Sequence, residues 1–156
     1  MTLAEYISAC FLVIAAAGVW LNWLQLRRNA KQRRAEWLAR MYGRYCEDGE
    51  MAAMFQRIEY KKFEYRDDSD FHDSNDELTL DRLLEHYEAV AMVYDLGMIE
   101  DSELKSFRFQ FRTVYKNAQV LKYLQYLDEW FAAQGMPEAA FLRSRGLAAE
   151  IQEKFP

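Results

Sequence analysis

The chain has 156 residues, of which 51% are hydrophobic and 15% aromatic, and its formal net charge is −5. This apolar content excludes an intrinsically disordered chain, and the length suits one domain of ordinary size. Only two prolines and six glycines occur in the whole chain. Because these helix-interrupting residues are few and helix-forming residues are abundant, we expect an all-α fold.

Charge is distributed unevenly along the chain. From Arg27 to Arg44 there are seven Lys or Arg residues and one acid, Glu36. From Tyr45 to the C-terminus there are 13 Lys or Arg residues against 23 Asp or Glu residues, a net charge close to −10. Nucleic acid and anionic lipid repel a surface of this sign. The sequence therefore predicts no nucleic-acid partner, and it confines binding to an anionic surface to the basic segment.

A long apolar segment lies near the N-terminus. No charged residue occurs from Tyr6 to Leu21, and the strongly polar residues from Tyr6 to Leu26 are Ser8, Asn22 and Gln25. As a helix, residues 6–26 measure about 31 Å, close to the thickness of a hydrocarbon core. Aromatic residues typical of membrane interfaces stand at the two ends: Tyr6, Trp20 and Trp23. Residues 1–26 are predicted to form a single transmembrane anchor; the alternative is a buried helix of a soluble protein.

The residues that flank this segment predict its orientation. A cleaved export signal has its positive charges before the apolar run. Here Glu5 precedes the run, and a basic collar follows it, consisting of Arg27, Arg28, Lys31, Arg33 and Arg34. The positive-inside rule then predicts an inner-membrane protein with its N-terminus outside and residues 27–156 in the cytoplasm. We expect the collar to bind anionic headgroups of the lipid bilayer.

One face of the apolar segment carries Ala15, Gly18 and Asn22 at helical spacing. Small residues let two helices approach closely in lipid, and an asparagine can hydrogen-bond to a partner helix. This face is a candidate for helix pairing. Alternatively, Asn22 is hydrated near the interface and the small residues have no such role.

Three parts are expected: an anchor at 1–26, a basic helical stalk at 27–45 and an acidic helical domain at 46–156. Within the domain, apolar stripes at helical spacing predict helices over about 49–63, from Ser74 or Asp76 to Gly97, from Asp101 or Ser102 through Tyr115, over about 118–134 and over about 137–153. Short connections favour a compact bundle of antiparallel neighbours. Residues 66–77 are expected to form a charged loop.

Few residues suggest chemistry. The chain has two histidines, His72 and His86, and two cysteines, Cys10 and Cys46, which lie on opposite sides of the collar and so are not expected to pair. No phosphate-binding loop, nucleophile elbow or metal-ligand spacing occurs. The group Glu85, His86 and Glu88 is interpreted as structural rather than catalytic. We therefore expect neither an enzyme nor a cofactor.

The acidic residues of 66–77 resemble a calcium ligand set only in composition. An EF-hand loop needs a glycine at its sixth position and a glutamate at its twelfth, and no register supplies both with the alternating ligands. A solvated loop is the favoured interpretation. Weak metal binding by His72 and its acidic neighbours is the alternative.

The stretches "LTLDRLLEHYEAVAMVYDLGMIEDSELKSF" and "VYKNAQVLKYLQYL", which follow an N-terminal anchor and a basic exit, resemble a family of small bacterial membrane proteins. The family is known as domain of unknown function 4760. The similarity covers about residues 5–130 and consists mostly of core and turn positions. It implies a helical fold on a single-pass anchor and no assigned activity.

The sequence as a whole predicts a membrane-anchored, non-enzymatic interaction or scaffolding protein, with a protein partner or a second copy of itself. The alternative is a membrane-tethered sensor of a small anionic ligand. Candidate contacts for the ligand or partner are Tyr87, Tyr94, Arg108 and Arg112, with Tyr115, Tyr123 and Tyr126 as further lining residues. An enzyme that uses His86 and its neighbouring carboxylates is the third hypothesis.

Overall fold

The computed structural model describes residues 3–136 and 138–154, and the side chains of residues 3–13 and of Cys46 lie outside this description. The described residues form helices and no strand, which confirms the predicted all-α class. They belong to two compact units, residues 1–40 and 41–156. The finer division at residues 26 and 45 stays a prediction.

The first unit consists of a single helix. α1 (Leu3–Glu47) runs without interruption from this unit into the start of the second. No proline occurs in it, and Gly43 is its only glycine after Gly18, so the sequence contains nothing that would break it. Every side chain from Ile14 to Arg33 is exposed.

Among the described residues, no helix is both long enough and apolar enough to cross a membrane. The predicted transmembrane anchor therefore has no support from this part of the chain. Residues 6–13, the first part of the predicted apolar segment, lie outside the described side chains, and with them Tyr6 and Cys10.

The last turns of α1 belong to the second unit and pack there through aromatic rings. The Tyr42 ring stacks on Phe107 at a centroid distance of 4.8 Å, and the Tyr45 ring meets the edge of Phe55 at 5.7 Å. Asp48 then begins α2 (Gly49–Glu59) because its carboxylate accepts the backbone N–H groups of Glu50 and Met51. These contacts join α1 and α2 at a sharp corner.

α2 ends at Glu59, four residues before the predicted end at 63. The carbonyl oxygen of Arg57 accepts the backbone N–H groups of both Lys62 and Phe63, and Lys61 has a positive φ of 55°. This turn leaves the helix axis and buries Phe63, which is 1% exposed. Burial of one aromatic ring thus decides where the helix stops.

α3 (Asn75–Asp95) begins and ends where the sequence predicts. The Ser74 hydroxyl accepts the backbone N–H of Glu77 at its N-terminus. Gly97 follows its C-terminus with φ of 67°, a conformation that costs glycine little and other residues more.

The single helix predicted after Asp101 is instead divided. α4 (Asp101–Leu104) passes through a 3-10 turn, η1 (Lys105–Phe107), into α5 (Arg108–Tyr115). The Ser106 hydroxyl donates to the carbonyl oxygen of Glu103 at 2.6 Å, a local bond of the kind that competes with α-helical geometry. The division keeps the predicted apolar residues buried: Leu104, Phe107, Phe111, Val114 and Tyr115.

The last two helices differ in how well the sequence predicts them. α6 (Ala118–Ala133) is capped by Asn117 and followed by Gly135, close to its predicted bounds. α7 (Leu142–Lys154) starts later than predicted; Pro137, its predicted first residue, lies outside the described residues. The start is delayed because Phe141 has a positive φ of 54°, and because the Ala140 N–H donates to the Asp128 carboxylate at 2.9 Å.

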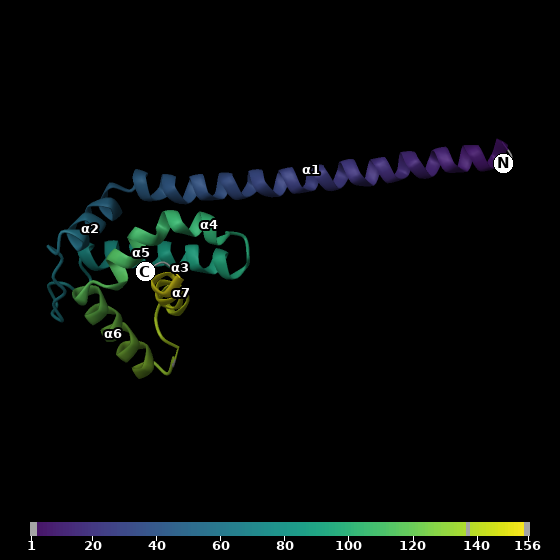
Figure 1. Ribbon diagram of the computed structural model, residues 1–156. Coiled ribbons are helices and arrows are strands. Elements are labelled where there is room, and N and C mark those ends of the chain that lie inside the picture. The colour runs from purple at the N-terminus through teal and green to yellow at the C-terminus, as the bar shows by residue number, and fades with distance from the viewer. Residues whose placement is uncertain (1–2, 137, 155–156) are drawn as a thin grey trace. The chain divides into compact units, whose positions relative to one another are not determined.

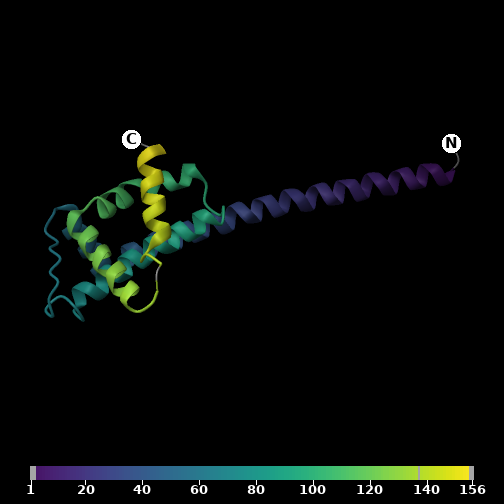
Figure 2. The same cartoon turned by 90° about the horizontal axis from the view of Figure 1, so that it is seen from below.

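α3 is the central element of the second unit. It packs against α2 and α7, and α5 packs against α2, α6 and α7. Figures 1 and 2 show α7, in yellow, crossing α3. The hydrophobic side chains with no exposed surface come mostly from α3: Leu80, Leu83, Leu84, Tyr87, Val90 and Ala91, together with Phe111, Val114, Val120 and Tyr123.

Candidate functional site

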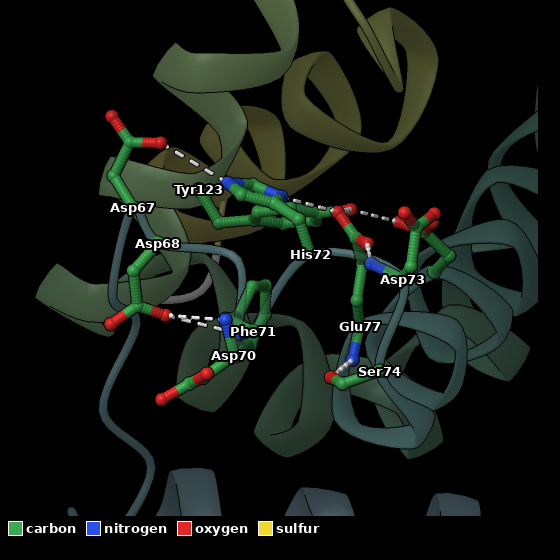
Figure 3. Close-up of polar contacts among 10 residues, drawn as sticks. Asp67, Asp68, Asp70, Phe71, His72, Asp73, Ser74, Glu77 and Tyr123 are labelled. Carbon is green, nitrogen blue, oxygen red and sulfur yellow. Dashed lines mark hydrogen bonds and ion pairs between the residues drawn. The ribbon is translucent and has the colours of Figure 1, made fainter.

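A cluster of polar side chains lies where the loop before α3 meets α3 and α6 (Figure 3). His72 lies between two carboxylates there. Its Nδ1 is 2.9 Å from Oε1 of Glu77, and its Nε2 is 3.1 Å from Oδ1 of Asp67. We call His72, Asp67 and Glu77 the histidine clamp.

Glu77 connects this clamp to the backbone and to the core. Its Oε2 accepts the backbone N–H of Asp73 at 2.7 Å, where Asp73 has a positive φ of 65°. Its Oε1 also lies 3.3 Å from the hydroxyl of Tyr123, which donates to Asp81 at 2.7 Å. Three groups, two from the loop and one from α6, therefore meet around the Glu77 carboxylate of α3 (Figure 3).

Aromatic rings surround the imidazole of His72. The Tyr126 ring lies against it at a centroid distance of 4.4 Å, and Tyr65 and Phe71 meet it edge-on at 6.1 and 5.7 Å. The side chain of His72 is 21% exposed. A partly desolvated cation beside aromatic rings is stabilised by them.

Burial and neighbouring charge oppose each other in this cluster. Burial lowers the pKa of His72, but its hydrogen bonds to Glu77 and Asp67 outweigh burial and raise the pKa above its ordinary value. Burial raises the pKa of the Asp81 carboxyl, although the Tyr123 hydroxyl favours its charged form. Burial beside acidic residues raises the pKa of Tyr65 to about 12. The cluster thus favours a charged histidine and uncharged phenols.

A second site is an open groove of about 410 Å³ between the end of α1, the start of α2 and one face of α3. Arg82, Glu85, His86 and Ala89 line it from α3, and Met41, Arg44, Asp48 and Met51 line it from α1, the corner and α2. Met41 and Met51 are buried, so the floor is apolar and the rim carries both signs of charge.

The charged groups of the groove differ in how far they are already paired. Arg82 donates to Asp48 and Glu50, at 3.4 and 2.5 Å, while its buried Nε has no hydrogen-bond partner among the described residues. Arg44, in contrast, makes no ion pair with another described side chain. His86 is 9% exposed, and burial together with the nearby charge of Arg44 lowers its pKa. Among the described residues, the groove therefore places the guanidinium of Arg44, which makes no ion pair, beside the uncharged imidazole of His86.

The predicted ligand contacts differ in their surroundings. Tyr87 is fully buried, and its hydroxyl has no hydrogen-bond partner among the described residues. The Tyr94 hydroxyl lies 2.7 Å from Asp101 and accepts from Lys154 at 3.2 Å, in a surface network near the end of α7. Arg108 and Arg112 lie on α5, half-buried and exposed respectively.

Tyr115 and Glu88 form a polar contact with α7 that the sequence did not reveal. The Tyr115 hydroxyl donates to the Ser144 hydroxyl at 2.6 Å. Glu88 accepts the Ser144 backbone N–H at 2.9 Å and the Ser144 hydroxyl at 2.7 Å. Glu88 on α3 thus accepts hydrogen bonds from the first turn of α7. Nothing in the local sequence of α3 or α7 indicates this pairing.

The basic collar and the interfacial tryptophans lie on the exposed part of α1. The guanidinium carbon of Arg27 lies 3.9 Å from the centroid of the Trp23 ring. The ring centroids of Trp20 and Trp23 are 5.1 Å apart. Exposed side chains include Arg28, Lys31 and Arg33, whereas Arg34 is half-buried. Ala15, Gly18 and Asn22 are all exposed, and a side chain added at Gly18 would meet no atom within 4 Å.

No group of three or more His, Cys, Asp or Glu residues in the described part of the chain could hold a metal ion. No protein-family model, curated protein or solved structure matches the chain. The resemblance to domain of unknown function 4760 therefore has no support from these comparisons and stays a prediction.

Proposed function

We propose that the protein is a single-pass, membrane-anchored interaction or scaffolding protein whose residues 27–156 lie on the cytoplasmic side. One observation carries the proposal: the apolar side chains from Ile14 to Leu26 are exposed to solvent on all sides of a helix. Val19, Leu21 and Leu26 expose 72%, 64% and 61% of their surface. A continuous apolar surface of this kind indicates contact with lipid or protein.

The residues that follow favour lipid as that contact. Trp20 and Trp23 stand at the end of the apolar segment, where interfacial tryptophans are enriched. The basic collar comes next, and each Lys or Arg near an anionic surface contributes about 1 kcal/mol to attraction. The acidic charge of residues 45–156 would oppose such attraction, which supports contact through the collar alone.

The interaction role is supported by apolar side chains that the second unit leaves exposed. Phe109 and Trp130 expose 56% and 45% of their surface, and Leu96 and Leu142 expose 66% and 59%. Aromatic residues on a surface are typical of protein interfaces. Their partner is proposed to be another protein or a second copy of the chain.

Membrane association is tested by alkaline extraction of cells that express the chain with a C-terminal fluorescent fusion. We expect the fusion protein to stay in the membrane pellet and to fluoresce brightly, as it should if its C-terminus is cytoplasmic. The double substitution Val19→Arg, Leu21→Arg places two charges in the proposed span and is expected to move the protein to the soluble fraction. Leu142→Arg changes a similarly exposed leucine outside the span and should leave the fraction unchanged. A wild-type protein found in the soluble fraction would reject the anchor.

The scaffolding role is tested by native mass spectrometry of the full chain after gentle extraction from its host membrane. A second protein, or a second copy, at fixed stoichiometry is expected. A bare monomer would count against this role.

The groove beside His86 favours a second candidate function, a membrane-tethered sensor of a small anion. Two observations favour it: among the described side chains, the Arg44 guanidinium makes no ion pair and the buried Nε of Arg82 has no hydrogen-bond partner. The direct probes are acetate and inorganic phosphate, added to the full chain in detergent during thermal unfolding. Binding raises Tm by mass action, and Arg44→Gln should remove the rise whereas Arg112→Gln, on exposed α5 surface, should not. No rise with either anion would reject this function.

A further inference from the structure

The geometry of the histidine clamp determines the protonation state of the His72 ring. A neutral imidazole has one N–H donor and one acceptor nitrogen, and an ionised carboxylate only accepts. Both ring nitrogens of His72 face carboxylate oxygens within hydrogen-bond distance, 2.9 Å to Glu77 and 3.1 Å to Asp67. The two contacts are both hydrogen bonds only when the ring is an imidazolium.

The charged groups around the ring have one sign. The loop contributes Asp67 and Asp73, α3 contributes Glu77, and Asp81 lies behind the Tyr123 hydroxyl. The remaining titratable neighbours are the phenols of Tyr65, Tyr123 and Tyr126. No Lys or Arg side chain among the described residues bonds to Asp67 or Glu77. Loss of the proton would therefore leave a lone pair facing a carboxylate with no cation to replace it.

The ring also joins three parts of the fold. Asp67 belongs to the loop, Glu77 to the first turn of α3, and Tyr126, which stacks on the ring at 4.4 Å, to α6. Within the loop, the backbone carbonyl of Asp68 accepts from Phe71 and His72, and that of Phe71 accepts from Ser74. The Asp68 carboxylate also accepts the backbone N–H groups of Asp70 and Phe71. Phe71, between these bonds, is 6% exposed and would gain exposure if the loop moved away.

We propose that His72 acts as a proton-dependent latch, which as an imidazolium fastens residues 66–73 to α3 and α6 and, on losing its proton, releases the loop and exposes Phe71. The latch is independent of the proposed membrane anchor, since all its groups belong to the second unit. The released surface carries the aromatic rings of Tyr65, Phe71 and Tyr126, which in the fastened state contact His72.

The test follows both histidines by NMR titration of the full chain in detergent micelles, with amide hydrogen exchange measured at pH 6 and pH 8.5. The two histidines are the only ones in the chain, so His86 is an internal reference. His72 is expected to titrate above 6.5 and His86 below it. Corrected for the intrinsic effect of pH, exchange at residues 66–73 should rise about fivefold or more at the higher pH, since a hydrogen bond to a charged group is lost. Exchange in α6 should not change.

Two asparagine substitutions distinguish the latch from a general effect of loop charge. Asp67→Asn removes one carboxylate of the clamp at a side chain that is 72% exposed, so the fold should survive. It should lower the midpoint of the His72 titration and release the loop at a lower pH. Asp70→Asn makes the same charge change at an exposed residue that does not contact His72, and should do neither. Unchanged loop exchange while His72 titrates, or titration of His72 at or below 6.5, would overturn the proposal.

Discussion

The two units use apolar side chains in opposite ways. In residues 41–156, Leu84 and Phe111 have no exposed surface, whereas in residues 1–40 the comparable Val19 and Leu21 are largely exposed. Burial of one large apolar side chain contributes about 1.5–3 kcal/mol. Apolar side chains of the second unit are buried by other residues of that unit and gain this free energy. The apolar side chains described in the first unit stay exposed and gain almost none of it. Residues 41–156 therefore supply the stability of the fold, and the exposed apolar segment supports the proposed contact with lipid or protein.

The largest expected change in stability distinguishes two leucine substitutions, one in each unit. Leu84→Ala removes a fully buried side chain and should lower the free energy of unfolding of the second unit by about 2–5 kcal/mol. Leu21→Ala, at an exposed site in the first unit, should change it by less than about 0.5 kcal/mol. Urea unfolding of the full chain in mild detergent measures both. Equal losses would show that the exposed segment also supports the fold.

A smaller loss is expected where α3 holds the first turn of α7. Glu88→Ala removes the acceptor for the Ser144 backbone N–H and hydroxyl, and should cost about 1–3 kcal/mol. Glu129→Ala is the matched control, because that glutamate is exposed and, among the described residues, its side chain accepts a hydrogen bond only from Gln125 on its own helix. Amide exchange in α7 should increase in the first variant alone. Unchanged protection of α7 would remove Glu88 from this capping role.

Two glycines of the second unit should respond differently to a methyl group. Gly97 has φ of 67°, and a Cβ there would meet no atom within 4 Å, so Gly97→Ala isolates backbone strain of about 1–2 kcal/mol. Gly49 also has open space but an ordinary φ at the start of α2. Gly49→Ala should therefore be neutral or slightly stabilising. A thermal-unfolding comparison of the two variants decides this, and similar shifts in Tm would contradict the assignment of strain.

The smallest expected effect is on the pH dependence of stability. Because the folded-state pKa of His72 is raised, its contribution is complete below its unfolded value near 6.5 and is lost as pH rises through the folded value. His86 has a lowered folded pKa, so its contribution is complete above 6.5 and is lost as pH falls through the window below it. His72→Gln should flatten the alkaline side of the stability profile and His86→Gln the acidic side. Urea midpoints between pH 5 and 9 measure this, and the reverse assignment would contradict both shifts.

Local sequence signals determined most helix boundaries. Ser74 caps α3, and Gly97 and Gly135 follow the ends of α3 and α6, because capping and positive φ depend on a residue and its close neighbours. The buried stripe of α3 followed from its 3.6-residue period for the same reason. The charge asymmetry and the apolar segment with its basic collar are likewise properties of the sequence alone, and they support the proposal of a membrane anchor.

Contacts between distant residues decided the rest. The turn after Glu59, where α2 ends, depends on burial of Phe63. The start of α7 depends on Asp128 and Glu88, which lie on other helices. Tyr123, a candidate lining residue of the alternative ligand pocket, is buried and donates to Asp81. His72 and His86 have similar acidic neighbours in sequence, yet one is held between two carboxylates and the other is buried near an arginine. Sequence spacing predicts which residues share a helical face, but packing in three dimensions decides which charges meet and how far they are removed from water.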